Sequence, residues 1–80
     1  MRKMVIKVKG YATMKPYTTH LPSDGELEIP EGTTIGSVFK KLNVPSESKN
    51  VIFVNGRHRS SEYRLRPGDT LVFFPTLEGG

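Results

Sequence analysis

One segment of this sequence has the period of an amphipathic helix, and it lies between segments with the period of strands. Its apolar residues are spaced at i, i+3, i+4 and i+7, so they lie along one face of a helix. They are Ile35, Val38, Phe39 and Leu42. Earlier, residues 3–9 alternate, so that Met4, Ile6 and Val8 lie on one face of a strand. One helix among strands predicts an α+β roll, a mixed sheet of roughly four to five strands with the helix packed on one face.

The other strands are bounded by residues typical of turns. We predict them at residues 26–29, 50–54 and 70–74, with a short additional strand at Tyr63 and Leu65. Asn55 and Gly56 predict a tight turn after residues 50–54, because both tolerate positive φ. Residues 10–24 have no clear period and contain Pro16, which interrupts helices, so we expect a long connection there.

The helix has signals at both of its ends. Thr33 or Thr34 can cap the N-terminus by accepting a backbone hydrogen bond in the first turn. Asn43 can adopt the left-handed conformation that ends a helix, and Pro45 prevents the helix from resuming.

The inward-facing positions of these elements predict one small core. They are Met4, Ile6, Val8, Leu27, Ile29, Ile35, Val38, Phe39, Leu42, Ile52, Val54, Leu65, Leu71 and Phe73. A chain of 80 residues forms one domain, and its core has no spare volume for a large pocket. Any chemistry is therefore expected at the surface or in a partner protein.

The composition argues against several classes of function. The chain has no cysteine, so it has no disulfide, no thiolate metal site and no cysteine nucleophile. Its 12 Lys and Arg outnumber its 8 Asp and Glu but are scattered, which favours an acidic face of a partner over nucleic acid. The N-terminal residues lack the apolar segment of a signal peptide, and no apolar run suits a membrane span, so we expect a soluble cytoplasmic protein.

No residue pattern indicates an active site within the chain itself. His20 and His58 are far apart in sequence and lack the spacing of metal ligands. The serines have no nucleophile-elbow setting, and Gly32 and Gly36 lack the end of a phosphate-binding loop. We therefore predict a non-catalytic protein that binds no metal or cofactor of its own.

Alternation also predicts an apolar patch on the outer face of the sheet. Where the core residues of strands 50–54 and 70–74 face the helix, their neighbours face away from it. The expected patch and its basic border are Phe53, Val72, Phe74, Lys7, Lys9 and Arg57. Such a patch would dock partner enzymes. A shift of register by one residue would instead bury the apolar members.

The end of the sequence is unusual for the end of a fold. An apolar strand stops at Pro75, which has no N–H to donate, and this divides the chain into a domain, residues 1–75, and a flexible tail, residues 76–80. Such a tail reaches about 17 Å. Gly79 and Gly80 have no side chains to obstruct a narrow channel. The residues alone leave open whether this tail is a chemical handle or a frayed terminus.

Four segments together resemble a known family. They are residues 30–36, the turn Val54-Asn55-Gly56, the turn Pro67-Gly68-Asp69 and the ending Phe73-Phe74-Pro75-Thr76-Leu77-Glu78-Gly79-Gly80. In this combination the chain resembles the β-grasp sulfur carriers. It looks most like the small subunit of molybdopterin synthase (MoaD), and more distantly like the thiamine-pathway carrier (ThiS) and ubiquitin. Residues 10–20 are longer than the family's usual loop, and the tail differs from its usual small, apolar one.

The resemblance implies that the chain carries sulfur on Gly80. In such carriers an E1-like activating enzyme uses ATP to adenylate the terminal carboxylate, and a sulfur donor converts it to a thiocarboxylate. An acceptor enzyme, such as the large subunit of molybdopterin synthase, then receives the sulfur for the molybdenum or tungsten cofactor. By the same resemblance Leu77, Glu78 and Gly79 form the tail that enters the partners.

Three alternatives stay open at this point. The chain could supply sulfur to thiamine or to another sulfur pathway. It could be a ubiquitin-like modifier joined through Gly80 to lysines of target proteins. It could also be a non-covalent β-grasp module that binds RNA or protein.

Overall fold

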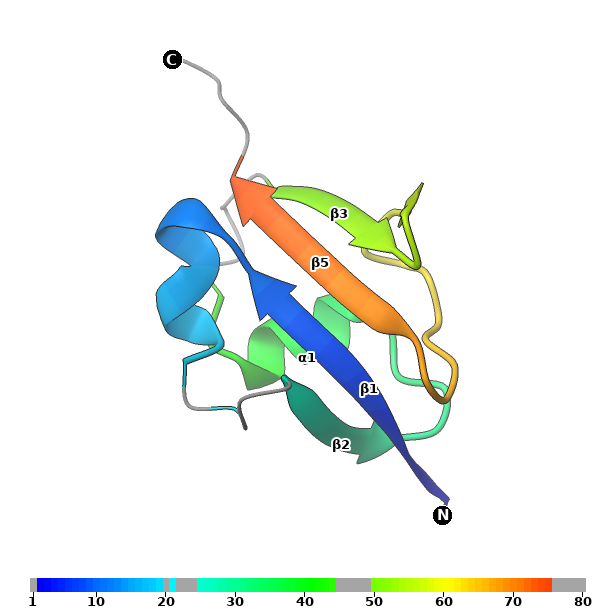
Figure 1. The fold of residues 1–80 in the computed structure, drawn as a ribbon. Helices are drawn as coiled ribbons and strands as arrows, with labels where there is room; N and C mark the ends of the chain where they lie inside the picture. Colours follow the sequence, from blue (N-terminus) through cyan, green and yellow to red (C-terminus); the bar gives the residue numbers. More distant parts are fainter. Residues whose placement is uncertain (1, 20, 22–24, 45–49, 76–80) are drawn as a thin grey trace.

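The computed structural model describes residues 2–19, 21, 25–44 and 50–75, and these form strands, one α-helix and one 3₁₀ helix. The elements, shown in Figure 1, are β1 (Lys3–Gly10), η1 (Ala12–Tyr17), β2 (Glu26–Pro30), α1 (Ile35–Lys41), β3 (Asn50–Val54), β4 (Arg57–His58) and β5 (Thr70–Pro75). Within these residues no helix is long and apolar enough to cross a membrane.

The strands form one mixed sheet of five strands in the order β2-β1-β5-β3-β4. The central strand β5 is parallel to its neighbour β1, and the other neighbouring pairs are antiparallel. Figure 1 shows α1 crossing behind the sheet on one face, with η1 beside the end of β1. This arrangement confirms the predicted α+β roll with a mixed sheet and an α-helix on one face.

The core lies between the sheet and α1, and alternation predicted most of it. Every expected core position is buried except Leu27 and Phe39, which are half-buried and pack against the same cluster. The ring of Phe39 lies 4.8 Å from that of Phe73, centroid to centroid, and so connects α1 to the central strand β5. Met14 and Val44 are further core residues that the sequence analysis missed.

The ends of α1 follow the sequence signals. The Thr34 hydroxyl oxygen accepts a hydrogen bond from the Ser37 N–H at 3.2 Å, which satisfies one donor of the first helical turn. After the helix, Asn43 has φ 64°, the left-handed conformation expected of it. The next residue turns back into the core, because the Val44 N–H donates to the Phe39 carbonyl at 2.9 Å.

The connection expected over residues 10–24 contains a 3₁₀ helix, η1, which the sequence analysis did not predict. Pro16 is compatible with this short helix, which ends one residue later at Tyr17. Tertiary packing stabilises it, since Met14 is 7% exposed and joins the core. A Cβ on Gly10 would lie 2.5 Å from the Met14 carbonyl oxygen, so only glycine lets η1 approach β1 this closely.

The short strand expected at Tyr63 and Leu65 is wrong. The segment makes a single isolated bridge, between Thr34 and Arg64, because its backbone bonds to the loop before α1 and not to the sheet. The Leu65 N–H donates to Thr33, and the Tyr63 carbonyl accepts from the Ile35 N–H. The fifth strand of the sheet is instead β4, which follows the predicted turn at Asn55 and Gly56.

Candidate functional site

The face of the sheet opposite α1 has an apolar centre. Phe53 of β3 lies opposite Val72 of β5, and Val51 lies opposite Phe74. These side chains are half-buried, whereas Leu71 and Phe73, which alternate with them, are buried under α1. The structure therefore brings Phe53, Val72 and Phe74 together on the open face, and we call these three residues the aromatic patch.

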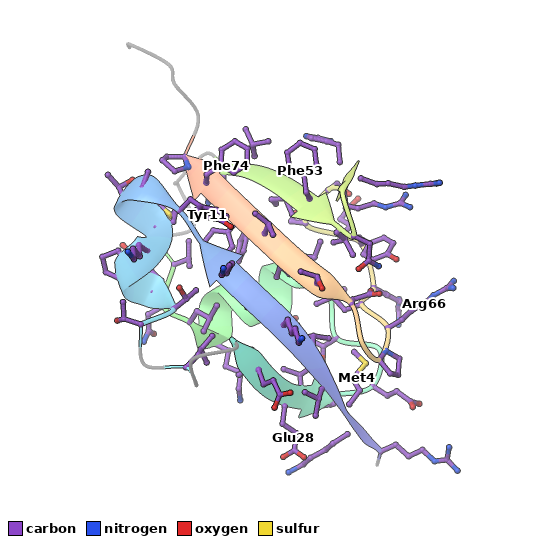
Figure 2. The ribbon with its side chains drawn as sticks, viewed as in Figure 1. Met4, Tyr11, Glu28, Phe53, Arg66 and Phe74 are labelled. Atoms are coloured by element: carbon purple, nitrogen blue, oxygen red, sulfur yellow. The ribbon has the colours of Figure 1, made fainter. Side chains whose placement is uncertain are left out.

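The two phenylalanine rings of the aromatic patch contact each other, and His58 contacts one of them. Figure 2 shows Phe53 and Phe74 side by side above β3 and the end of β5. Their centroids are 5.9 Å apart at an interplanar angle of 26°, and His58 meets Phe53 edge-on at 5.8 Å and 86°. Such contacts fix ring orientation, so a partner would find the patch already ordered. Its function as a docking surface stays a prediction.

The two lysines expected at the border of the patch lie at different distances from it along β1. Lys9 lies beside Val72 in the parallel pairing of β1 and β5, whereas Lys7 lies further along, beside Thr70. Across β1 and β2, Lys7 is opposite Glu26. The exposed lysine that adjoins the aromatic patch is therefore Lys9.

The register places Arg57 differently from our expectation. Arg57 lies opposite Val54, whose side chain is buried on the helix side of β3. His58 lies opposite Phe53 and takes the position beside the patch. The two residues of β4 present opposite faces because side chains alternate along a strand. The expected border of the patch named Arg57, and the register places His58 there instead.

Tyr11 is a surface aromatic residue that the sequence analysis did not assign to the site. Its side chain is 47% exposed, and Figure 2 shows it at the end of β1, near Phe74. Its backbone N–H donates to the Phe73 carbonyl at 3.1 Å, which extends the pairing of β1 with β5. The sequence feature that could have pointed to Tyr11 is its position directly after Gly10, at the end of the first predicted strand.

The last strand loses its β1 partner at Pro75. The Phe73 carbonyl faces β1 and accepts from Tyr11, so the next parallel hydrogen bond would require an N–H on Pro75. Proline has none. Pro75, the last residue of β5, still lies opposite Asn50 of β3. The predicted tail residues Leu77, Glu78, Gly79 and Gly80 lie outside the described residues, and the division into domain and tail stays a prediction.

The buried carboxylate of Asp69 forms structural hydrogen bonds and is not part of an arrangement typical of an active site. Asp69 is 6% exposed and accepts hydrogen bonds from the Asn55 side chain and the Arg66 N–H, each at 2.9 Å. The Asn55 side-chain oxygen accepts from the Thr70 N–H at 3.0 Å. This network joins the β3–β4 turn to the start of β5. In the part of the chain that the structure describes, no group of three or more His, Asp or Glu could hold a metal ion.

The arrangement of sheet, helix and open face defines a ubiquitin-like small protein of the β-grasp fold, and solved structures agree. The Haloferax volcanii HVO 2177 protein is similar over 98% of this chain and 88% of its own, with TM-score 0.72 and 18% identity. H. volcanii small archaeal modifier protein 1 is similar over 92% and 99%, with TM-score 0.64 and 13% identity. A Caldiarchaeum subterraneum ubiquitin is similar over 99% and 100%, with TM-score 0.62 and 22% identity. At these identities the likeness establishes the fold.

The sequence also identifies the family. The model of the ThiS family matches residues 11–80, and the chain belongs to that family. It is therefore a ubiquitin-like small protein of a sulfur-carrier family whose members are generally non-catalytic and act with E1-like activating enzymes. Among curated proteins, none matches this chain by sequence.

Proposed function

We propose that this protein carries sulfur as a thiocarboxylate on Gly80 and donates it in the synthesis of molybdopterin, the pterin part of the molybdenum or tungsten cofactor. The observation that carries the proposal is the end of β5 at Pro75, beside the aromatic patch and five residues before Gly80. Membership of the ThiS family supports the chemistry. The sequence supports the specific pathway through its likeness to the small subunit of molybdopterin synthase.

The proposed chemistry requires two displacements, the first at the α-phosphorus of ATP and the second at the carboxyl carbon of Gly80. A carboxylate oxygen attacks the α-phosphorus of ATP, pyrophosphate leaves, and an acyl-adenylate forms. Sulfide, or the terminal sulfur of a donor persulfide, then attacks the carbonyl carbon, and AMP leaves with the electron pair. Sulfide gives the thiocarboxylate directly. A persulfide gives an acyl disulfide, and a thiol then attacks the donor sulfur, forms a disulfide with it and releases the thiocarboxylate. The activating enzyme supplies the acid and base groups for these steps. This chain supplies a reactive terminus and a recognised surface, so it acts as a substrate rather than as an enzyme.

The chain's sequence suits a carrier of this kind. With no cysteine, the protein offers no thiol that could compete with Gly80 as a site for covalent sulfur. Gly79 and Gly80 lack side chains, so the terminus could enter a narrow active-site channel. The proposal places the protein in the cytoplasm, with an E1-like enzyme and an acceptor enzyme such as the molybdopterin synthase large subunit as partners. It binds no cofactor itself, and the activating enzyme uses the ATP.

Intact mass spectrometry of the protein purified from its native cells tests the proposal. We expect a species in which one oxygen of the Gly80 carboxyl group is replaced by sulfur. The same measurement reports whether Gly80 is the last residue of the mature protein. A chain that carries no sulfur, in cells that are actively making the cofactor, would contradict the proposal.

Reconstitution separates the possible pathways. Thiocarboxylated protein should support molybdopterin formation with the large subunit of molybdopterin synthase and should not support formation of the thiamine thiazole. The reverse result would assign the chain to the thiamine pathway, to which the matching family model also points.

A protein modifier is the second candidate function, because one similar structure is named small archaeal modifier protein 1. In this case Gly80 forms an isopeptide bond with lysines of other proteins after the same adenylation. Conjugates of increasing mass that resist denaturation and disappear when Gly80 is deleted would identify a modifier. Retention on an RNA column that is independent of Gly80 would instead favour the third alternative, a non-covalent binding module.

A further inference from the structure

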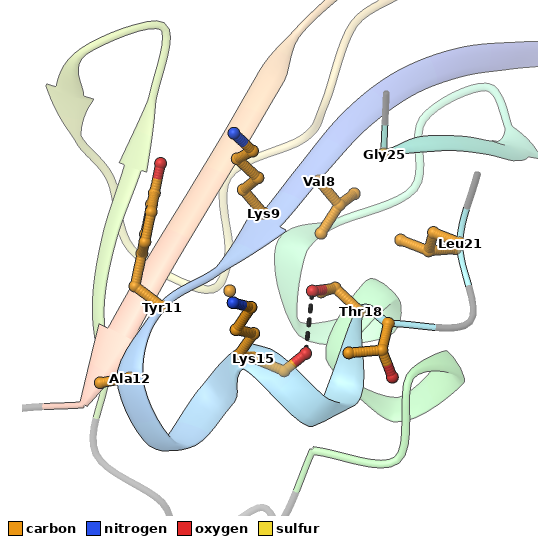
Figure 3. Close-up of a pocket in the computed structure, with 10 residues that line it drawn as sticks. Val8, Lys9, Tyr11, Ala12, Lys15, Thr18, Leu21 and Gly25 are labelled. Atoms are coloured by element: carbon orange, nitrogen blue, oxygen red, sulfur yellow. Dashed lines mark hydrogen bonds between the residues drawn. The ribbon is translucent and has the colours of Figure 1, made fainter. Parts of the chain in front are cut away.

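A hollow of about 450 Å³ lies at the end of β1, beside η1 and outside the aromatic patch. The residues that line it include the apolar Val8 and Leu21 and the polar Lys9, Tyr11, Lys15 and Thr18. Figure 3 shows Lys9, Tyr11 and Lys15 around the point where β1 passes into η1. Nothing in the proposed chemistry at Gly80 uses these residues.

The hollow exists because β1 continues beyond the end of β2. The pairing of the two strands ends at Lys7 and Glu26, followed by one hydrogen bond from the Val8 N–H to Gly25 at 2.9 Å. Lys9 and Gly10 extend past this point, and η1 turns back beside them. Gly10 permits this close approach, so the hollow depends on the backbone of the fold and not on movable side chains alone.

The hollow is cationic. Among the described residues that line it, Lys9 and Lys15 are charged and none is acidic. Within those residues neither lysine forms an ion pair, whereas Lys3, at the other end of β1, lies 3.9 Å from Glu28. The hydroxyls of Thr18 and Thr19 donate to the carbonyls of Lys15 and Pro16, each at 3.1 Å, so both protons are already used. The polar donors available to a ligand are therefore the two ammonium groups and the Tyr11 hydroxyl.

The hollow lies close to the end of β5 and to the aromatic patch. Tyr11 bonds through its N–H to Phe73, two residues before β5 ends, and Lys9 lies beside Val72 of the aromatic patch. A protein that covers the patch and receives the tail is thereby brought alongside Lys9, Tyr11 and Lys15. Lysines that are exposed at the edge of an apolar contact steer a partner of opposite charge and add specificity.

We propose that this hollow receives an acidic segment of the activating enzyme, whose Asp or Glu carboxylates contact Lys9 and Lys15 while its apolar surface covers the aromatic patch. The inference rests on the proposed function, because it takes the occupant to be the enzyme that handles Gly80. Carboxylates fit the donors present, and the open hollow admits a protein loop together with its backbone.

Nuclear magnetic resonance of the full-length labelled protein tests the hollow directly, with a glutamate oligopeptide as probe. We expect the largest amide shifts at residues 9–19, and weaker shifts as salt is raised. Lys9→Glu or Lys15→Glu should each weaken peptide binding roughly fivefold. Arg66→Glu is the matched control, since it makes the same charge change on an exposed turn before β5, away from η1 in Figure 2, and should leave binding unchanged.

Two outcomes of this titration would overturn the proposal. In one, Arg66→Glu weakens the peptide as much as Lys9→Glu does, which would mean that only net charge matters. In the other, a uridine oligonucleotide produces the same shifts at lower concentration than the peptide, which would assign the hollow to RNA.

Loading of Gly80 by the activating enzyme separates this proposal from the proposed function. In Lys9→Glu and Lys15→Glu we expect kcat/KM for adenylation to fall about fivefold through KM, with kcat unchanged, because the contact forms before the chemical step. Unchanged kcat/KM in both variants would overturn the role of the hollow and leave the carrier function intact. Failure of the unmodified protein to be adenylated would overturn the proposed function, whatever the hollow binds.

Discussion

Two adjacent phenylalanines in β5 have opposite roles because side chains alternate along a strand. Phe73 is 0% exposed and contacts Phe39 of α1, whereas Phe74 is half-buried and stacks with Phe53 on the open face. The same chemical group therefore contributes to stability at one position and to a surface at the next. Substitutions at the two positions can separate folding from docking.

We predict that Phe74→Arg weakens binding to the activating enzyme by about tenfold or more, because it places a charge in the aromatic patch. It should cost about 1 kcal/mol or less of unfolding free energy. Phe73→Ala is the opposite control and should cost about 3–5 kcal/mol by leaving a cavity in the core. Denaturant titration and a binding isotherm measure the two effects. If Phe74→Arg were already unfolded without denaturant, this face of the sheet would be required for folding.

Asp69 is the residue whose loss should most disturb the turns around β5. Asp69→Ala removes the acceptor of two part-buried hydrogen bonds and should lower the free energy of unfolding by about 1–2 kcal/mol, because the Asn55 side chain and the Arg66 N–H lose their partner. Asp69→Asn keeps one acceptor oxygen and should cost less. Equal stability of Asp69→Ala and the unmodified protein would mean that water replaces both bonds without cost.

At the scale of elements, η1 is stable because of its contacts and not because of its sequence. Its length, Pro16 and lack of an N-terminal side-chain cap give it little intrinsic stability, yet Met14 places it in the core. β5 shows the converse. Its continuous apolar run predicted a strand, and the sheet places it at the centre, between β1 and β3.

We predict that Gly10→Ala displaces η1, because the added Cβ would lie 2.5 Å from a backbone oxygen of Met14. The expected cost is about 1–3 kcal/mol of unfolding free energy, with faster amide exchange concentrated in residues 12–17. Gly36→Ala in α1 is the matched control. Its nearest contact would be 3.4 Å, and alanine favours a helix, so stability should stay level or rise. Faster exchange spread over the whole sheet would contradict a local role for Gly10.

At the scale of the whole molecule, every core residue identified lies before Pro75. We predict that deleting residues 76–80 leaves the melting temperature unchanged within about 2 °C, because no residue of this core is removed. The same deletion should abolish adenylation. Deleting Gly80 alone should also abolish it, while the aromatic patch still binds the activating enzyme. A large fall in melting temperature would show that the tail belongs to the fold.

The sequence alone determined which residues of each element face the core, because the period of a strand or helix is a local property of the chain. The inward positions of Met4, Ile6 and Val8 and the stripe on α1 follow from spacing. Residues 71–74 are all apolar, so their spacing left the outward position of Phe74 dependent on the register. Turn residues such as Asn55 and Gly56, and the cap at Thr34, also act locally. Gly79, Gly80 and the absence of cysteine are visible in the sequence itself, and they indicate a sulfur carrier without any knowledge of the fold.

Only the tertiary structure decided which elements lie side by side. The parallel pairing of β1 with β5 joins residues more than sixty positions apart, and it places Lys9 beside Val72. The pairing of His58 rather than Arg57 with Phe53, the formation of η1 around Met14 and the hollow beside Lys15 depend on the same long-range contacts. The spacing of apolar residues within a strand does not specify which strand lies next to it. That choice depends on the packing free energy of the whole folded chain.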